Sequence, residues 1–173
     1  MSLFKSDDTL EKVLKAKTID PELIEAAVAS LRFKNKTIAT LNGSFDLLHA
    51  GHLEILFQAA KQADVLFVLL NSDASIKLYK SPLRPIVPLA YRLKLMAALS
   101  FVGYVTWFEE IDPRALLARI QPDVHVNGAE YGENCIEADI VKKGGGRIHI
   151  VSLVEGLSTS NIIHKIVTTC AIS

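Results

Sequence analysis

The chain of 173 residues contains little that could crosslink it, hold it in a membrane or attract nucleic acid. Its two cysteines, Cys135 and Cys170, form no C-x-x-C pair, which favours free thiols in a reducing compartment over a disulfide. Basic and acidic residues number 19 each, so a broad basic surface for duplex nucleic acid is not expected. No apolar run reaches the length of a membrane span, and no signal-peptide pattern opens the chain. We therefore expect a cytoplasmic protein that binds neither membranes nor nucleic acid.

Several common catalytic motifs are also missing. There is no G-x-G-x-x-G after the first predicted strand and no G-x-x-x-x-G-K-[ST], which disfavours a classical dinucleotide site and a P-loop. Gly43-Ser44-Phe45 does not complete the G-x-S-x-G frame of a serine hydrolase. The histidines spaced by three have no acidic or cysteine partner beside them, which makes a weak metal site, so no metal held by the protein is expected.

Apolar residues make up 50% of the chain, enough for the core of one domain, and their order predicts alternating strands and helices. Residues 65–70 are apolar throughout, as in a strand buried on both faces of a parallel sheet. The pattern predicts a Rossmann-like, doubly wound parallel α/β sheet over residues 36–173, preceded by a helical extension over residues 1–35. Asp20 before Pro21 is a start signal for the second helix of that extension. Further strands are expected over 37–41, 104–108, 124–126 and 147–153, and further helices over 50–62, 89–99, 113–120 and 159–169.

Short polar or glycine-containing segments follow the predicted strands, at residues 42–46, 71–73, 127–131 and 156–160. Ligands of doubly wound sheets bind outside the carboxyl ends of the strands. We therefore expect these four segments to meet on one binding rim. His125 and His149, which fall inside predicted strands, are expected to be structural.

The segment His49-Ala50-Gly51-His52 carries the strongest functional signal. Residues at positions i and i+3 share a helix face, so both rings can point at one spot just off the start of the predicted helix. Free backbone amides and the helix dipole favour an anion there, and Gly51 lets a bulky ligand approach the main chain. The segment predicts a phosphate-handling site without a covalent nucleophile. This suits phosphoryl or nucleotidyl transfer, in which the protein positions groups and stabilises charge.

The segment Leu41–His52 resembles the signature of the cytidylyltransferase-like nucleotidyltransferase superfamily. Residues 71–75, 84–92 and 156–163 are similar to the adenylyltransferase domains of bacterial ADP-heptose synthases, and the similarity runs from about residue 36 to 168. The resemblance implies transfer of the AMP moiety of ATP, with Mg²⁺, to a sugar 1-phosphate. The acceptor implied is D-glycero-β-D-manno-heptose 1-phosphate, with ADP-heptose for lipopolysaccharide and pyrophosphate as products. It also implies a homodimer.

The resemblance implies roles for individual residues as well. His49 and His52 would stabilise the transferring α-phosphate, Arg92 would reach the triphosphate or the substrate phosphate, and Asp46 would hold the loop or the metal. The residues implied to bind nucleotide are Asn42, Gly43, Ser44, Phe45, Asp46, Gly51, Asn127, Gly128, Glu130, Tyr131, Ser158, Thr159 and Ser160. The residues implied to bind the acceptor substrate are Asn71, Asp73, Lys80 and Arg84.

One segment departs from the family pattern, because Asn127-Gly128-Ala129-Glu130-Tyr131 stands where the family commonly has Lys-Gly-Gly-Asp-Tyr. A fixed positive charge near the nucleotide is therefore missing. Two other functions stay open: CTP-dependent transfer to a polyol or amino-alcohol phosphate, and nucleotide binding without catalysis. A fragment of a class I tRNA synthetase, which shares H-x-G-H, is disfavoured because the chain lacks the usual length and the second, lysine-rich signature loop.

Overall fold

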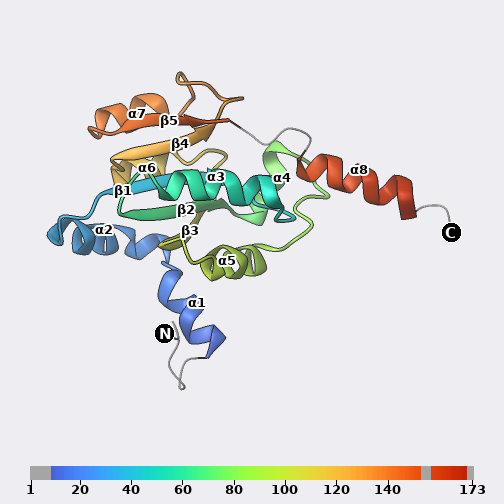
Figure 1. Cartoon of the computed structure of the whole chain (residues 1–173), viewed down its shortest axis with the longest axis horizontal. Coiled ribbons are helices and arrows are strands. Elements are labelled where there is room, and N and C mark those ends of the chain that lie inside the picture. Colours follow the sequence, from blue (N-terminus) through green and yellow to red (C-terminus); the bar gives the residue numbers. More distant parts are fainter. Residues whose placement is uncertain (1–8, 153–156, 171–173) are drawn as a thin grey trace.

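A computed structural model describes residues 9–152 and 157–170 and contains one sheet of five parallel strands (Figure 1). The strands are β1 (Ile38–Gly43), β2 (Val65–Asn71), β3 (Tyr104–Phe108), β4 (Val124–Gly128) and β5 (Arg147–Val151). Their order is β3-β2-β1-β4-β5, so the chain builds outward from β1 to β3 and then returns to the other side of β1. The topological switch point therefore lies between β1 and β4, where sheets of this kind bind ligands. The predicted doubly wound α/β sheet is confirmed.

Helices cover both faces of the sheet (Figure 1). They are α1 (Leu10–Lys17), α2 (Ile24–Phe33), α3 (Ala50–Ala60), α4 (Asp73–Tyr79), α5 (Leu89–Ala98), α6 (Arg114–Ile120), α7 (Ala138–Lys143) and α8 (Thr159–Cys170), with a 3₁₀ turn at Pro21–Leu23. Leu56 of α3 and Met96 of α5 pack with Val68 on one face. Leu117 of α6 packs with Phe67 on the other. Successive residues of β2 thus enter opposite cores, as its unbroken apolar run predicts.

The N-terminal helices pack against this same sheet. Leu14 of α1 belongs to the core that contains α3 and α5, and Ile24 of α2 belongs to the opposite core. Asp20 accepts a backbone hydrogen bond at 2.9 Å and caps the 3₁₀ turn, as its place before proline predicts. The Ile19 amide donates at 2.9 Å to the carbonyl of Val105, a residue of the edge strand β3. The division of the chain at residue 35 stays a prediction.

Two short helices differ from the sequence expectations. α4 occupies residues 73–79, where a loop was expected to follow β2 directly, and Ser72 caps it by accepting the Ser75 amide at 3.0 Å. α7 over residues 138–143 was not expected at all. Each is two turns or less, too short for an apolar period to identify. A serine cap followed by Asp73 in the first turn was a local signal for α4.

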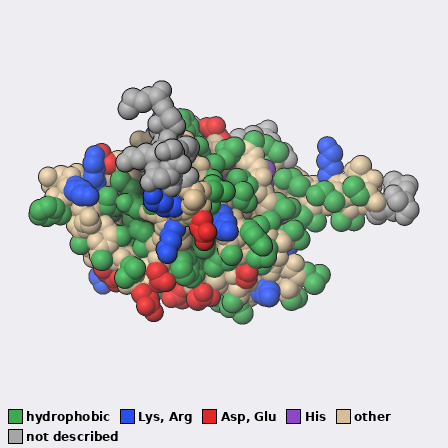
Figure 2. Space-filling model, turned by 90° about the horizontal axis from the view of Figure 1, so that it is seen from below, with side chains coloured by type: hydrophobic (Ala, Val, Ile, Leu, Met, Phe, Trp, Pro, Cys, Tyr) green, Lys and Arg blue, Asp and Glu red, His purple; other side chains and the backbone are tan. Residues whose placement is uncertain are grey.

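α8 begins where the sequence predicts and projects from the rest of the molecule (Figures 1 and 2). The Ser158 hydroxyl accepts the Asn161 amide at 3.1 Å, as an N-cap does. Residues 153 and 156, assigned from the sequence to the last strand and the rim, lie outside the described residues. Of the helices in the described ranges, none has the length and apolar character that a membrane crossing requires.

His125 is fully buried and is the second residue of β4. Its Nδ1 lies 2.8 Å from the Thr40 hydroxyl on the neighbouring strand, and burial lowers the pKa of His125 to about 4. His149 occupies the middle of β5, at the edge of the sheet. Both precede the carboxyl ends of their strands, by three residues in β4 and by two in β5, and their structural role stays a prediction.

Candidate active site

The two histidines of the H-x-G-H segment stack at the start of α3. The centroids of the His49 and His52 rings are 3.7 Å apart, and their planes differ by 19°. His49 is the N-cap of α3, and its Nδ1 accepts a long hydrogen bond of 3.4 Å from the His52 amide. A Cβ on Gly51 would lie 3.1 Å from the His49 ring, so the glycine avoids a close contact with that ring. Both rings therefore lie beside the free amides at the helix start.

The environment of the two rings disfavours positive charge on them. Burial lowers the pKa of His52 to about 4, and His49 and Lys80 add to the lowering while Asp46 opposes it. Burial also lowers the pKa of His49. The Nδ1 of His52 is buried and has no hydrogen-bond partner within residues 9–152 and 157–170. At neutral pH the pair is therefore uncharged and offers ring N–H donors to a ligand.

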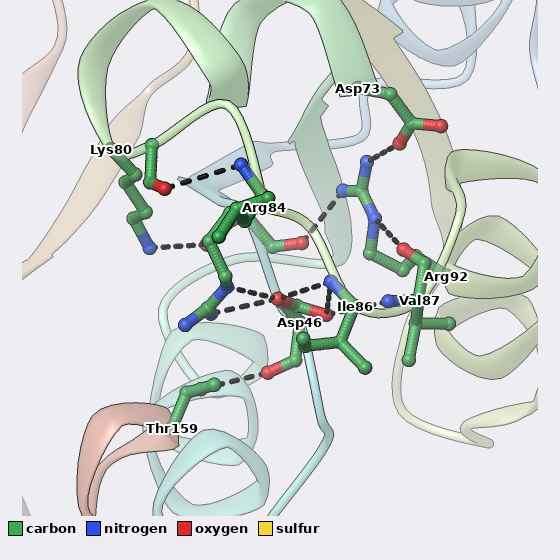
Figure 3. Close-up of polar contacts among 11 residues, drawn as sticks. Asp46, Asp73, Lys80, Arg84, Ile86, Val87, Arg92 and Thr159 are labelled. Atoms are coloured by element: carbon green, nitrogen blue, oxygen red, sulfur yellow. Dashed lines mark hydrogen bonds and ion pairs between the residues drawn. The ribbon is translucent and has the colours of Figure 1, made fainter. Parts of the chain in front are cut away.

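Asp46 holds the loop between β1 and α3 in place (Figure 3). Its carboxylate is 1% exposed and accepts hydrogen bonds from Arg84 Nε at 2.9 Å and from the Val87 amide at 2.9 Å, with the Ile86 amide at 3.0 Å. Burial raises the pKa of Asp46, but the two amides and the Arg84 charge outweigh it, and the pKa is lowered overall. The Asp46 carbonyl accepts the Thr159 hydroxyl at 2.8 Å. Asp46 thus joins the β1–α3 loop to the proline-containing loop before α5 and to α8.

Arg92 braces the same loop from inside the protein (Figure 3). Its side chain is fully buried, and three of its nitrogens donate to protein acceptors. Nη1 reaches the Ser44 carbonyl at 2.7 Å, Nε the Val87 carbonyl at 2.9 Å, and Nη2 the Asp73 carboxylate at 2.8 Å. In this arrangement Arg92 supports the loop. Its contact with a phosphate, implied by the resemblance, stays a prediction.

Lys80, just after α4, adds a positive charge beside the β1–α3 loop. Its Nζ donates to the Ser44 hydroxyl at 2.8 Å (Figure 3). Burial lowers the pKa of Lys80, Arg84 adds to the lowering, and Asp46 opposes it. Tyr79, which the sequence did not single out, lies in the same region: burial raises its pKa, and Ser44 opposes that shift. Its place at the end of a helix that the sequence missed explains why no local pattern pointed to it.

Asn71, the last residue of β2, and Asp73, the first residue of α4, both form hydrogen bonds within the protein. The Asn71 side-chain amide donates to the Ser75 hydroxyl at 3.0 Å, and that hydroxyl donates to the Glu110 carbonyl. One carboxylate oxygen of Asp73 accepts the Leu89 amide at 2.9 Å as well as Arg92. These contacts fix the start of α4 against α5. Their role in binding an acceptor substrate stays a prediction.

The end of β4 supplies the other side of the rim. Asn127 is 5% exposed, and its side-chain amide lies 3.5 Å from a carboxylate oxygen of Glu137, which is 6% exposed. Glu137 precedes the unexpected helix α7 and was not identified from the sequence. A Cβ on Gly128 would lie 2.2 Å from a Glu130 carboxylate oxygen, so that side chain folds back over the strand end. Tyr131 is 65% exposed beside it.

The remaining predicted residues lie at the end of β1 and the start of α8. The Asn42 side-chain oxygen is buried, with no partner within the described residues. Phe45 packs edge-on against the His52 ring at 5.2 Å, and a Cβ on Gly43 would lie 3.0 Å from the Phe45 ring. Ser160 is exposed in the first turn of α8. The described residues predicted for the site therefore come from strand ends, from helix starts and from the loops that adjoin them.

Comparison with known proteins identifies the family. Residues 40–167 match the family described as cytidylyltransferase-like. The chain belongs to the cytidylyltransferase-like family of nucleotidyltransferases. The match begins within β1 and ends within α8, so it contains the histidine pair, both loops that Asp46 joins, and the Asn127–Glu137 contact.

Individual relatives of this cytidylyltransferase-like chain extend the comparison. It is 40% identical to the bifunctional protein HldE of Trichlorobacter lovleyi over 146 residues. The aligned region covers 84% of this chain and 30% of the relative. The chain thus spans about a third of the length of the curated relatives it matches. The crystal structure of the lipopolysaccharide core biosynthesis protein from Thermoplasma volcanium matches with a TM-score of 0.55 and 26% identity, covering 69% of this chain and 97% of that one. A pantoate-beta-alanine ligase from Francisella tularensis shares the fold, with a TM-score of 0.58 and 14% identity over 88% of this chain and 79% of that one.

Proposed function

We propose that this chain is a sugar-phosphate adenylyltransferase. It joins the AMP moiety of ATP to a sugar 1-phosphate, D-glycero-β-D-manno-heptose 1-phosphate, and releases ADP-heptose and pyrophosphate. The observation that carries the proposal is the stacked pair of His49 and His52 at the start of α3, next to Lys80. Relatives named bifunctional protein HldE and a similar lipopolysaccharide core biosynthesis protein support the choice of sugar.

The reaction needs stabilisation of charge more than covalent chemistry. An oxygen of the sugar 1-phosphate attacks the α-phosphorus of ATP, and the bond from that phosphorus to the bridging oxygen breaks. Pyrophosphate leaves with the electron pair of that bond. Negative charge rises on the oxygens of the α-phosphate, where ring N–H groups of His49 and His52 donate hydrogen bonds. The backbone amides and dipole of α3 act on the same charge.

The other residues of the site hold or attract the phosphates. Lys80 and Arg84 supply positive charge beside the β1–α3 loop, and Ser158 and Thr159 offer backbone amides at the start of α8. The Thr159 hydroxyl is already donated to Asp46, so its contribution comes from the main chain. Glu130 and Tyr131, with Asn127 and Gly128 at the end of β4, border the base and the ribose. Asn42, Gly43, Ser44, Phe45, Gly51 and Ser160 complete the nucleotide site, and Asn71 and Asp73 adjoin the acceptor.

Mg²⁺ would bind together with ATP. Within residues 9–152 and 157–170, no group of three or more His, Cys, Asp and Glu side chains is arranged to hold a metal ion. The Asp46 carboxylate, an obvious candidate, is occupied by Arg84 and two backbone amides. The ion would bind with the triphosphate and would neutralise phosphate charge there.

A cytidylyltransferase acting on a polyol or amino-alcohol phosphate is the second candidate. Asn127 favours it, because the positive charge that the family commonly has beside the nucleotide is replaced by a carboxamide in contact with Glu137. A homodimer and a cytoplasmic location stay predictions as well. Apolar side chains exposed on α8, among them Ile166 and Val167, are consistent with a partner for that helix.

The decisive experiment is a matrix of nucleotides and acceptors. Purified protein is incubated with MgATP or MgCTP and with heptose 1-phosphate, glycerol 3-phosphate or phosphocholine, and pyrophosphate release is measured. Turnover is expected with MgATP and heptose 1-phosphate, and activity with CTP alone would reject the adenylyl reaction. His49→Ala and His52→Ala should each abolish turnover, whereas His149→Ala on β5 should retain it. Substantial turnover in either site variant would refute the proposed role of the pair.

A further inference from the structure

The geometry of the histidine pair makes its charge depend on whether phosphate is bound. Two positive rings whose centroids are 3.7 Å apart would repel each other. The Nδ1 of His49 accepts the His52 amide hydrogen, so this nitrogen carries no proton in the observed arrangement. The Nδ1 of His52 is enclosed, with no acceptor for a proton within the described residues. Without bound phosphate, both rings are therefore neutral.

The charged groups around the pair maintain this neutral state. Burial has the largest effect and lowers the pKa of His52. Lys80, at the end of α4, lowers this pKa further. Asp46, in the β1–α3 loop, raises it, but by less than burial lowers it. Arg84 pairs with Asp46 at 2.7 Å, which offsets the negative charge of that carboxylate. Phe45, which packs edge-on against the His52 ring, is uncharged.

Nucleotide phosphates reverse the balance, because they bring several negative charges to the start of α3. An anion within about 4–6 Å favours the charged form of a histidine and shifts its pKa by roughly 1–3 units. Positive charge on one ring disfavours positive charge on the other, so only one ring of the stacked pair becomes protonated. We infer that binding of the nucleotide draws one proton from the solvent onto the His49–His52 pair, which then holds one positive charge beside the phosphates.

The inference rests on the proposed function only for the identity of the ligand, MgATP. A buffer acid gives up the proton, the lone pair on Nδ1 of His49 accepts it, and no bond of the nucleotide changes. The 3.4 Å hydrogen bond from the His52 amide to that nitrogen is lost, while the same amide keeps its 2.9 Å bond to the His49 carbonyl. The positive charge is then in place before pyrophosphate leaves. Release of the product phosphates returns the proton to the solvent.

Calorimetry measures the number of protons directly. MgATP is titrated into the protein without acceptor at about pH 7.5, in two buffers of different ionisation enthalpy. The difference in observed binding enthalpy gives the protons taken up, and Mg²⁺ keeps the terminal phosphate of ATP deprotonated. About one proton per nucleotide is expected. The dissociation constant should fall by up to about tenfold for each pH unit that the solution is made more acidic.

Nuclear magnetic resonance of ¹⁵N-labelled histidine places the proton. In the wild-type protein at neutral pH, His49 and His52 should show neutral ring nitrogens when empty, and one positive ring should appear with MgATP. The double variant His49→Gln/His52→Gln should lose the proton uptake. His149→Gln, on β5, is the matched control and should retain it. Binding without proton uptake, or uptake that leaves both rings neutral, overturns the inference.

The failures of the two proposals are distinguishable. Turnover with MgATP and a sugar phosphate, but without proton uptake, overturns this inference and leaves the proposed function standing. Proton uptake on MgATP binding, but no turnover with any acceptor, overturns the proposed function alone.

Discussion

The hydroxyl of Thr159 donates a hydrogen bond of 2.8 Å to the main-chain carbonyl of Asp46, although the two residues lie 113 positions apart. This contact fixes the start of α8 against the loop that leads into α3. Close to it, a Cβ on Gly51 would lie 3.5 Å from the Leu157 Cβ. Two helix starts, each with free amides for an anion, therefore lie side by side.

Thr159→Val tests whether this contact matters for nucleotide binding. Valine keeps the shape of the side chain but leaves the Asp46 carbonyl without its donor, a loss of about 0.5–1.5 kcal/mol. We expect the KM for ATP to rise about threefold to tenfold with a smaller change in kcat, measured by pyrophosphate release. Thr159→Ser, which retains the hydroxyl, should behave like the wild type. An unchanged KM in Thr159→Val would show that the start of α8 is held without this bond.

Asp46→Asn should destabilise the fold, because it breaks a buried ion pair with Arg84. The expected loss in the free energy of unfolding at pH 7 is about 3 kcal/mol, measured by urea denaturation. Asp112→Asn, which breaks a pair with Arg114 at the surface, should lose less than about 1 kcal/mol.

The effect of Asp46 on stability should also depend on pH. The pKa of Asp46 is lowered in the folded state, so its contribution is present above its unfolded pKa of about 4. That contribution is lost as pH falls through the lower folded pKa. The difference in stability between wild type and Asp46→Asn should therefore shrink in acid. A difference that stays constant from about pH 7 to 2 would contradict the assigned ion pair.

Arg92→Lys keeps a positive charge but cannot make the three hydrogen bonds of the guanidinium. We expect a loss of about 2–3 kcal/mol in the free energy of unfolding, together with a lower kcat/KM, because Ser44 and Val87 lose their common support. Asp73→Asn weakens the same link from its other end. A double-mutant cycle on the unfolding free energies should give a coupling of about 1–3 kcal/mol. Strict additivity would mean that the two side chains do not act together.

Lys80→Gln should weaken phosphate binding without unfolding the protein. Lys80 donates to the hydroxyl of Ser44 and supplies positive charge beside the histidines. We expect the KM for ATP or for the sugar phosphate to rise about tenfold, equivalent to about 1.4 kcal/mol. The pKa of His52, measured by nuclear magnetic resonance of its ring, should rise because a neighbouring cation is removed. Lys77→Gln, on an exposed position of α4, is the matched control, and an equal effect there would argue against a specific contact.

The predictions from sequence succeeded where a short stretch of chain contains its own signal. The strand over residues 104–108 has the predicted bounds, and the helix expected from residue 50 begins there. Asp20 and Ser158 cap the turns that follow them, because a capping side chain bonds to an amide two or three residues away. The stacked histidines belong to this group too, since a spacing of three places both rings on one helix face.

Local patterns in the sequence were enough to predict the parallel α/β sheet, the order of its larger elements and the two histidines at the start of α3. The fold was needed to show that Arg92 is buried, that Asp46 binds Arg84 and Thr159, and that Glu137 contacts Asn127. Apolar period and capping are local properties that a few neighbouring residues express. The partner of a buried charge is chosen by the packing of distant segments, and no spacing along the chain records it.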